Sequence, residues 1–298
     1  APVKAAPARV LLRLLLAGAV LSAAFLVYGE LPAVGVNDRF EPKLDRARED
    51  EGELVQHKCR AHGKQVAPLI CVYGDPGSEK RVVLFGDSHA LQWGPALIPI
   101  ANRRGWKLIT VVRAGCPIAD VVTEPDCAEW RRQALDLIEK IEPKNIVIST
   151  SIGGRYRLRH GGLDLSRKES ESRLRAGMVR TIERLKAIDS LVSDESAITL
   201  IRDQVMAPFV PADCLKENRG KVERCVFPNQ RKFGPGFDWE AARETGITPT
   251  IDPTKVLCDR KWCSPTQGKF LKYRDTDHIT ATYARTLSKW FEDRLGIE

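Results

Sequence analysis

From Arg81 onward, short apolar stretches alternate with amphipathic ones, and this alternation limits the chain to few folds. We expect strands at 81–87, 106–115, 144–151, 197–205 and 254–258, and helices at 89–105, 127–143, 171–192 and 279–296. Leu174, Met178, Ile182 and Leu185 give the helix at 171–192 one apolar face, at three- and four-residue spacing. Strands that alternate with helices form a parallel, doubly wound sheet with right-handed crossovers. The sequence therefore predicts an α/β domain with flanking helices.

The stretch VVLFGDSHALQ, residues 82–92, places Ser88 where the first of these strands ends and a helix begins. One interpretation is structural: Asp87 or Ser88 caps the helix, because short oxygen-bearing side chains accept hydrogen bonds from the free amides there. The other is chemical, since α/β hydrolytic enzymes expose a nucleophilic hydroxyl at such a strand-to-helix turn. Ligands of open parallel sheets bind beyond the carboxyl ends of the strands. The position of Ser88 favours the chemical interpretation.

A serine nucleophile needs a base, and the chain has five histidines. His278 stands in YRDTDHIT, just before the last predicted helix, and Asp275 precedes it by three residues. At that spacing a carboxylate can fold back in a turn and accept a hydrogen bond from the imidazole, as the third member of a triad does. We expect Asp277, next to His278, to point elsewhere. The structural alternative is a cap, with Asp277 or Thr280 at the start of the helix, but a cap does not explain two acids and a histidine together.

The two motifs in this order, GDSH after the first strand and D-x-x-H before the last helix, resemble those of the SGNH hydrolase superfamily. More narrowly, RVVLFGDSHALQW, RAGCPIAD and CDRKWC are similar to stretches of the extracytoplasmic SGNH domains fused to acyltransferase-3 membrane proteins, which O-acetylate cell-surface polysaccharides. The resemblance covers residues 81–298 and extends upstream to a final membrane span and a linker. It implies that Ser88 is the nucleophile, His278 the general base and acid, and Asp275 the residue that orients His278.

The predicted oxyanion hole departs from the pattern of the superfamily. Its asparagine donor at the end of the third strand has no match, because that strand ends STSIGG and Asn145 lies at the other end. The superfamily's glycine donor corresponds to Gly115, which can instead serve a tight turn before Cys116. One oxyanion donor is typically worth ~10²–10³ in rate, so the gap matters. We expect the backbone amides of Ser88 and Gly115 to act as donors, with help from Thr150, Ser151 or Gly153.

Residues 10–28 are almost entirely apolar and are interrupted only by Arg13 near one end. About nineteen such residues span the hydrocarbon core of a membrane, and Arg13 can snorkel. Lys4, Arg9 and Arg13 mark the cytoplasmic end by the positive-inside rule. A cleaved signal peptide is the competing interpretation, because AVLSAAF contains small residues suited to processing. We expect a transmembrane helix and cytoplasmic flank over 1–30, an extracytoplasmic connector that packs onto the main domain over 31–78, and the SGNH-like catalytic domain over 79–298.

The eight cysteines fall into local pairs along the sequence: Cys59 and Cys71, Cys116 and Cys127, Cys214 and Cys225, Cys258 and Cys263. None has the C-x-x-C spacing of a zinc site or a thioredoxin-like centre. His57 and His62 lie near Cys59, but no ligand set with suitable spacing is completed there, so we expect no metal. An even number of cysteines behind a membrane segment predicts up to four disulfides in an oxidising compartment. Sequential pairing is the simplest of the many connectivities that eight cysteines allow.

The net charge of +8 and the isoelectric point of about 9.1 are basic, but Lys and Arg are interspersed with Asp and Glu. The sequence has no arginine-rich block, no zinc-finger spacing and no interleaving of aromatic and basic residues of the kind that single-strand binders use. We therefore expect no nucleic-acid partner. An anionic membrane surface or polysaccharide fits the charge at least as well.

Three functions stay open on the sequence. A transferase would pass an acetyl group from Ser88 to a sugar hydroxyl, an esterase would pass the same acyl group to water, and an inactive domain would only bind glycans. The resemblance favours the transferase, anchored in a bacterial inner membrane with the catalytic domain in the periplasm. It implies a polysaccharide acceptor and an acyltransferase-3 membrane domain as partner. The chain begins at Ala1 without a methionine, so we expect a fragment that this partner domain precedes. We expect no cofactor bound by the domain itself, and an acetyl donor, derived from acetyl-CoA, that is supplied through the partner.

Overall fold

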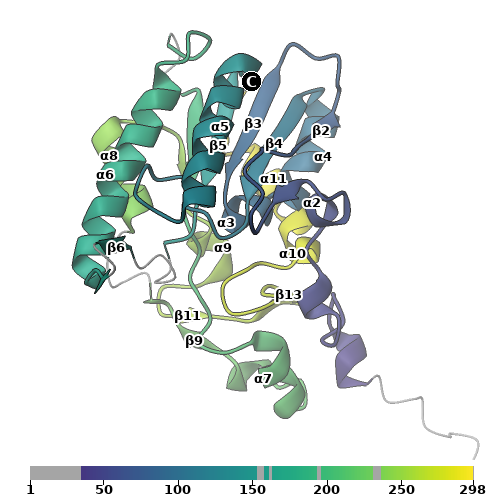
Figure 1. Cartoon of the computed structure of the whole chain (residues 1–298). Coiled ribbons are helices and arrows are strands. Elements are labelled where there is room, and N and C mark those ends of the chain that lie inside the picture. The colour runs from purple at the N-terminus through teal and green to yellow at the C-terminus, as the bar shows by residue number, and fades with distance from the viewer. Residues whose placement is uncertain (1–34, 153–157, 161–162, 193–195, 231–235, 298) are drawn as a thin grey trace, which may run out of the picture.

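The computed structural model describes residues 35–152, 158–160, 163–192, 196–230 and 236–297. In that part of the chain, the central sheet has seven strands: β1 (Arg60–Ala61), β2 (Ile70–Gly74), β3 (Arg81–Gly86), β4 (Lys107–Arg113), β5 (Asn145–Ser149), β8 (Ile198–Ile201) and β10 (Thr250–Ile251). Their order is β1–β4–β3–β5–β8–β10, and all neighbours on this path are parallel. Figure 1 labels β2, β3, β4 and β5 of this sheet. The strand β2 runs antiparallel to β4 at the edge. The predicted α/β fold with a parallel sheet is confirmed.

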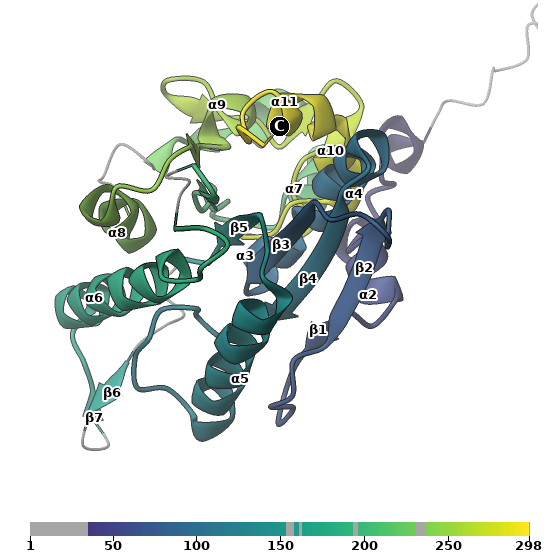
Figure 2. The same cartoon turned by 90° about the horizontal axis from the view of Figure 1, so that it is seen from above.

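Helices cover both faces of this sheet (Figure 2). One face carries α4 (Gly94–Arg104), α10 (Ala281–Thr286) and α11 (Ser288–Glu292), and the other carries α5 (Pro125–Ile141), α6 (Arg167–Lys186) and α8 (Phe237–Thr245). Successive residues of a strand point to opposite sides, so Val82 and Leu84 of β3 pack in the first layer while Val83 and Phe85 pack in the second. The central strand is therefore apolar along its whole length, as burial on both faces requires.

Shorter elements surround the carboxyl edge of the sheet. They are the helices α2 (Glu53–Gln56), α3 (Ser88–Leu91), α7 (Pro211–Glu217) and α9 (Thr254–Leu257), 3₁₀ turns at Val36–Arg39, Ala47–Glu49 and Val222–Arg224, and three strand pairs, β6 (Arg159–His160) with β7 (Leu163–Asp164), β9 (Phe227–Pro228) with β11 (Trp262–Cys263), and β12 (Thr266–Gln267) with β13 (Phe270–Leu271). The last pair leads directly into the 275–278 segment that holds the second motif.

The structure differs from the sequence prediction at the fifth strand. Residues 254–257 form the helix α9, and the strand next to β8 is instead the two-residue β10. The reason lies in Asp252 and Pro253, which follow β10. The Asp252 side chain accepts a hydrogen bond from the Thr254 amide at 3.0 Å, and Pro253 has helical dihedral angles. The chain therefore turns out of the sheet before Thr254.

Two predicted helices are each divided in two. The helix expected at 89–105 breaks between α3 and α4, and Pro95 lies in the first turn of α4, where no backbone donor is needed. The helix expected at 279–296 breaks between α10 and α11 at Leu287. The break after α3 matters for the site, because α3 is then only the four residues that begin with Ser88.

The segment before β3, expected to be a connector, adds β1 and β2 to the free edge of β4. Further upstream, Phe40 and Leu44 are buried in one apolar cluster with Leu215 of α7 and Leu271 of β13. The segment from residue 35 onward therefore packs against the main domain at two places.

All eight cysteines are paired, and each is bonded to its neighbour in the sequence. The local pairing expected from the sequence is confirmed. The bonds Cys59–Cys71, Cys116–Cys127, Cys214–Cys225 and Cys258–Cys263 join residues separated by 12, 11, 11 and 5 positions. They therefore fix local loops rather than joining distant parts of the fold.

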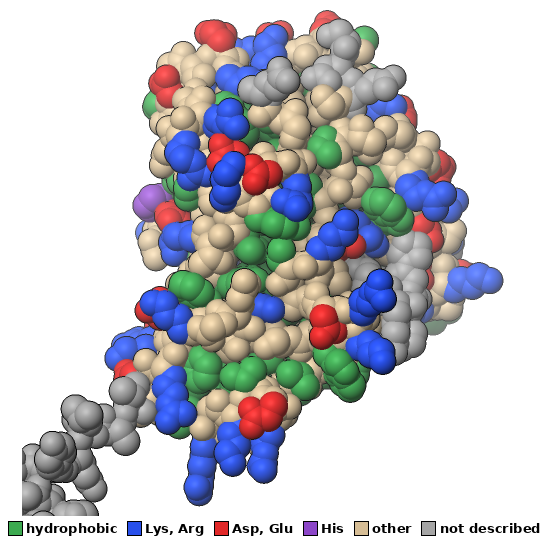
Figure 3. Space-filling view, turned by 180° about the vertical axis from the view of Figure 1, so that it is seen from behind, with side chains coloured by type: hydrophobic (Ala, Val, Ile, Leu, Met, Phe, Trp, Pro, Cys, Tyr) green, Lys and Arg blue, Asp and Glu red, His purple; other side chains and the backbone are tan. Residues whose placement is uncertain are grey.

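The predicted membrane segment over 10–28 lies outside the described residues. Within the described ranges, no helix combines the length and the apolar character needed to cross a membrane. On the face of the molecule seen in Figure 3, Lys and Arg side chains are scattered among Asp and Glu side chains, as their interspersed order in the sequence predicts.

Candidate active site

Ser88 follows the carboxyl end of β3 and is the first residue of α3. Between them, Gly86 lies where β5 approaches most closely: a Cβ atom on Gly86 would be 2.0 Å from the Ser149 carbonyl oxygen and 2.4 Å from the Ala90 Cβ atom. Any side chain there would push the strand and the helix apart, so glycine is required. Ser88 itself is only half-buried.

Asp87 fixes the turn on which Ser88 stands. Its Oδ1 accepts a hydrogen bond from the His89 amide at 2.8 Å, which makes Asp87 the N-cap of α3. Its Oδ2 accepts from the Thr150 hydroxyl at 2.8 Å and from the Ser151 amide at 2.9 Å. The fully buried carboxylate thereby joins the turn after β3 to the end of β5. Since Asp87 supplies the cap, the structural and chemical interpretations of the GDSH motif are compatible.

The second motif brings His278 to the hydroxyl of Ser88. His278 Nε2 lies 2.9 Å from Ser88 Oγ, and His278 Nδ1 lies 2.9 Å and 3.1 Å from the two carboxylate oxygens of Asp275. In this arrangement the carboxylate holds Nδ1 as the donor, so that Nε2 is free to accept the serine proton. The structure therefore places the three residues that the two motifs single out in one hydrogen-bonded chain.

A tight turn holds Asp275 in place. Its Oδ1 accepts hydrogen bonds from the backbone amides of Asp277 at 2.9 Å and His278 at 2.7 Å. Burial alone would raise the pKa of Asp275, but its hydrogen bond to His278, the nearby charges and the backbone amide together hold that pKa well below its ordinary value. Arg274 contributes one of these charges, with Nη1 3.9 Å from Asp275 Oδ2 and 2.7 Å from Glu51. Asp275 is therefore ionised at neutral pH, as an orienting acid must be.

The expectation that Asp277 points away from His278 is wrong. Asp277 Oδ1 lies 3.5 Å from His278 Nδ1, and Oδ2 lies 3.9 Å from His89 Nε2. The turn around Asp275 folds the segment back, so both acids lie near the same edge of the imidazole. The cap of α10 is Thr280, whose hydroxyl accepts from the Tyr283 amide at 3.1 Å.

A buried pair that was not predicted from the sequence lies beside these residues. His89 Nδ1 is hydrogen-bonded to Asp203 Oδ1, and both side chains are buried. Burial lowers the pKa of His89, but the negative charges of Asp203, Asp87 and Asp277 outweigh it and raise the pKa to about 9. The sequence did contain a signal: Asp203 follows the apolar strand β8, at the sheet edge where Ser88 also lies.

The family model described as the SGNH domain fused to AT3 domains matches residues 58–293 of the chain. The chain belongs to this family. The resemblance drawn from GDSH and D-x-x-H is thus confirmed, and the matched region also includes β1 and β2.

Among solved structures, this SGNH domain is similar to the periplasmic domain of the lipopolysaccharide acetyltransferase of Salmonella ser. Paratyphi A. The TM-score is 0.59, the sequence identity is 13%, and the alignment covers 85% of this chain and 96% of the other. At that identity the similarity concerns the fold. A comparison with curated proteins gave no significant match.

Two of the groups expected as oxyanion donors at the end of β5 in this SGNH domain are already hydrogen-bonded to Asp87. The Thr150 hydroxyl and the Ser151 amide both donate to Asp87, so these two hydrogens are not available to an oxyanion, while a role for other groups of Thr150 and Ser151 stays a prediction. Gly153 lies outside the described residues. Gly115 follows β4 at the same sheet edge as Ser88 and has a φ of 69°, which favours glycine. The amides of Ser88 and Gly115 stay our predicted donors.

Asp275, Asp277 and His278 also form the one group, within the part of the chain that is described, in which three side chains of types that bind metals come within 4.8 Å of one another. Hydrogen bonds account for this proximity. Asp275 Oδ1 is shared between two backbone amides, Oδ2 faces His278 Nδ1, and His278 Nε2 faces Ser88. We therefore assign these residues to the serine-centred site rather than to a metal centre.

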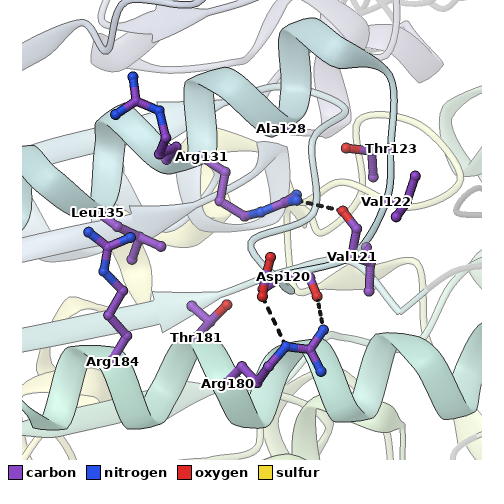
Figure 4. Close-up of a pocket in the computed structure, with 11 residues that line it drawn as sticks. Asp120, Val121, Val122, Thr123, Ala128, Arg131, Leu135, Arg180, Thr181 and Arg184 are labelled. Carbon is purple, nitrogen blue, oxygen red and sulfur yellow. Dashed lines mark hydrogen bonds and ion pairs between the residues drawn. The ribbon is translucent and has the colours of Figure 1, made fainter.

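A cavity of about 540 Å³ lies between α5, α6 and the loop after β4 (Figure 4). Two of the four arginines that line it form hydrogen bonds with this loop. Arg131 donates to the Val121 carbonyl oxygen at 2.6 Å, and Arg180 donates to the Asp120 carboxylate at 2.9 Å. None of the residues that line the cavity belongs to the serine-centred site. We assign these arginines to the support of the loop between Gly115 and α5.

Proposed function

We propose that this SGNH domain transfers an acyl group, most simply acetyl, to a hydroxyl group of a cell-surface polysaccharide outside the cytoplasm. The observation that carries the proposal is the hydrogen-bonded chain from Ser88 Oγ through His278 to Asp275. Membership of a family whose domains are fused to AT3 domains supports transfer. So does the fold shared with the periplasmic domain of a lipopolysaccharide acetyltransferase.

In the first half-reaction, Ser88 Oγ attacks the carbonyl carbon of the acyl donor while His278 Nε2 takes the hydroxyl proton. The Asp275 carboxylate stabilises the imidazolium that forms, because it faces Nδ1. When the tetrahedral intermediate collapses, the bond between the carbonyl carbon and the leaving group breaks. His278 then returns the proton to that leaving group, and the acyl group stays on Ser88.

In the second half-reaction, a sugar hydroxyl attacks the acyl-serine while His278 Nε2 accepts its proton. The ester bond to Ser88 breaks, and the proton returns to Ser88 Oγ, so the site is restored. Water can replace the sugar in this step without any other change. An esterase that removes acyl groups from a glycan is therefore the alternative function, and the partial exposure of Ser88 to solvent favours it.

We also propose the compartment in which the reaction takes place and the domain that supplies the acyl group. Four disulfides support an oxidising compartment outside the cytoplasm, and we assign residues 10–28 as the anchor in the bacterial inner membrane. An AT3 membrane domain, on the same polypeptide or on a separate chain, would bring the acyl group to Ser88, and the SGNH domain itself needs no bound cofactor for the steps above. The acceptor polysaccharide would reach Ser88 from the periplasm.

The test compares the O-acetyl content of surface glycan, measured by NMR, in cells with the intact gene, with Ser88→Ala, or without the gene. Ser172→Ala, at an exposed position of α6, is the matched control. We expect acetylation with the intact gene and with Ser172→Ala, and a loss in the other two cell lines. Lower acetylation with the intact gene than without it would show that the protein is an esterase. Equal glycan acetylation in all four kinds of cell would contradict the proposal.

A further inference from the structure

A second acid and a second imidazole lie next to the three residues of the proposed mechanism. Asp277 is 1% exposed and His89 is 1% exposed. Asp277 stands between the two imidazoles, with one oxygen 3.5 Å from His278 Nδ1 and the other 3.9 Å from His89 Nε2. The two rings are 4.9 Å apart between centroids, at an angle of 57°. Buried charges at these distances interact strongly, because little water separates them.

Hydrogen bonds from two further elements hold this group in position. Gln204, which follows β8, donates to the Asp277 carbonyl oxygen and accepts from Gln92 at 2.8 Å. Gln92, at the end of α3, in turn accepts from the Ile279 amide at 2.8 Å. Both amide side chains are buried. The segment 277–279 is therefore attached to the turn that carries Ser88 and to the end of β8.

His89 is held from the other side by Asp203. The Asp203 Oδ2 accepts from the Ile152 amide at 2.8 Å, while Oδ1 faces His89 Nδ1 and accepts from the Gln204 amide at 3.0 Å. The negative charges around His89 favour its protonated form despite burial. A positive charge at His89 then lies close to His278, because the two ring centroids are 4.9 Å apart.

We propose that Asp277 and His89 are positioning residues that act through His278: Asp277 adds a second negative charge at Nδ1, and the His89 cation opposes it. The proposal rests on the proposed function, since it concerns the base of that reaction. When His278 takes the proton of Ser88, Asp277 favours the resulting imidazolium and His89 disfavours it. Together they would set the pH at which His278 is available as a base.

Among the described residues, the charged groups that face His278 and His89 can be named individually. His278 is faced by Asp275 and Asp277 from its own loop and by His89 from α3, with Arg274 next to Asp275. The charges that act on His89 come from Asp203 after β8, Asp87 before α3, and Asp277. A change at Asp277 or His89 therefore alters one charge among these described groups.

The experiment measures the pH profile of kcat/KM for an activated acetyl ester with the full chain in detergent. Its acidic limb reports protonation of the catalytic base. Asp277→Asn removes a negative charge without changing shape, so the midpoint of this limb should move to lower pH. His89→Asn keeps a donor for Asp203 but removes the positive charge, so the midpoint should move to higher pH. Each shift should be on the order of one pH unit, and the double variant should return towards the wild-type midpoint.

A merely structural role would lower kcat without moving the midpoint in opposite directions, and that result would overturn the proposal. NMR titration of the His278 imidazole in ¹³C-histidine-labelled protein gives the same comparison without turnover, which covers a variant that folds but is inactive. Circular dichroism identifies a variant that does not fold. If His89→Asn does not fold, the midpoint measured for Asp277→Asn tests the proposal by itself. If Ser88→Ala turns over the ester at the wild-type rate, the proposed function fails. If Ser88→Ala is inactive and neither variant shifts the midpoint, only this proposal fails.

Discussion

Ser88 Oγ and His278 Nε2 lie 2.9 Å apart although 190 positions separate the two residues. Ser88 follows the central strand β3 and His278 lies in the loop before α10, so the site forms only when both ends of the domain are in place. The buried amides of Gln92 and Gln204 reinforce this contact, because they attach the loop with His278 to α3 and β8. The serine–histidine contact is thus supported by the hydrogen bonds of Gln92 and Gln204 next to it.

Substitution of the three residues in the hydrogen-bonded chain should separate their roles. Ser88→Ala removes the attacking oxygen and His278→Ala removes its base, so each should reduce turnover of an activated acetyl ester to background. Asp275→Asn keeps the shape but changes the partner of Nδ1, so a residual activity about 10⁴-fold below wild type is expected. Steady-state kinetics, together with mass spectrometry of the acyl-enzyme, checks all three. Wild-type turnover by Ser88→Ala would contradict the covalent mechanism.

Thr150→Val should separate a structural role from an oxyanion role. The valine removes one of the hydrogen bonds that Asp87 accepts, so the free energy of unfolding should fall by about 1–3 kcal/mol. We expect kcat to change by less than about tenfold, because the hydroxyl is engaged with Asp87. A loss of ~10²–10³ in kcat would instead identify Thr150 as an oxyanion donor.

The control for this variant is Thr181→Val on α6. The Thr181 hydroxyl is also buried and donates to the Ile118 carbonyl oxygen at 2.7 Å, but it lies at the cavity between α5 and α6. Urea denaturation should show a similar loss of stability for both variants. Ester turnover should be unchanged in Thr181→Val.

The four disulfides predict that the denatured, unreduced protein has no titratable thiols and that reduction yields eight. Each bond closes a short loop, and in the chain-entropy model closing a loop of about fifteen residues contributes ~3 kcal/mol. The double variant Cys116→Ser/Cys127→Ser should therefore lower the melting temperature clearly, and it should loosen the loop that follows Gly115. Eight reactive thiols before reduction, in protein exported to an oxidising compartment, would contradict both the bonds and the proposed location.

Much of the fold can be predicted from the sequence because the four main strands are continuous apolar runs separated by amphipathic helices. The strand β10 could not be predicted in the same way. Its two residues are too few to show a period, and the apolar stretch after Pro253 resembles a strand until the turn at Asp252 is known. The edge strands β1 and β2 were also missed, because only pairing with β4 distinguishes them from a loop.

The candidate site could also be predicted only in part from the sequence. Ser88, Asp275 and His278 lie in two short local motifs, and local spacing was enough to find them. The contact of His89 with Asp203 spans 114 positions, and the contact of Asp87 with Thr150 spans 63. These contacts depend on strand order and register, which put the ends of β3, β5 and β8 side by side. The sequence pattern predicts a parallel sheet but does not state that order.

The stability of the fold should fall as pH rises from about 6.5 to about 9, because of His89. Burial opposes the charge on His89, yet Asp203, Asp87 and Asp277 raise the folded pKa from 6.5 to about 9. Below 6.5 both the folded and unfolded chains hold the proton, and the stabilisation is complete. Between 6.5 and 9 the unfolded chain releases its proton first, so the folded state loses its advantage. The full loss is on the order of 3 kcal/mol.

Other groups also titrate in this range, so the measurement is the difference in unfolding free energy between the wild type and His89→Asn. Urea denaturation at pH 6, 7.5 and 9 provides it, with the disulfides intact. At pH 6 the wild type should be more stable by the largest margin, because the raised pKa of His89 favours its protonated form beside the buried Asp203. The margin should narrow steadily up to pH 9. A margin that stays constant would show that folding does not shift the pKa of His89, and a margin that widens with pH would show that the folded protein favours neutral His89, with Asp203 only accepting a hydrogen bond from it.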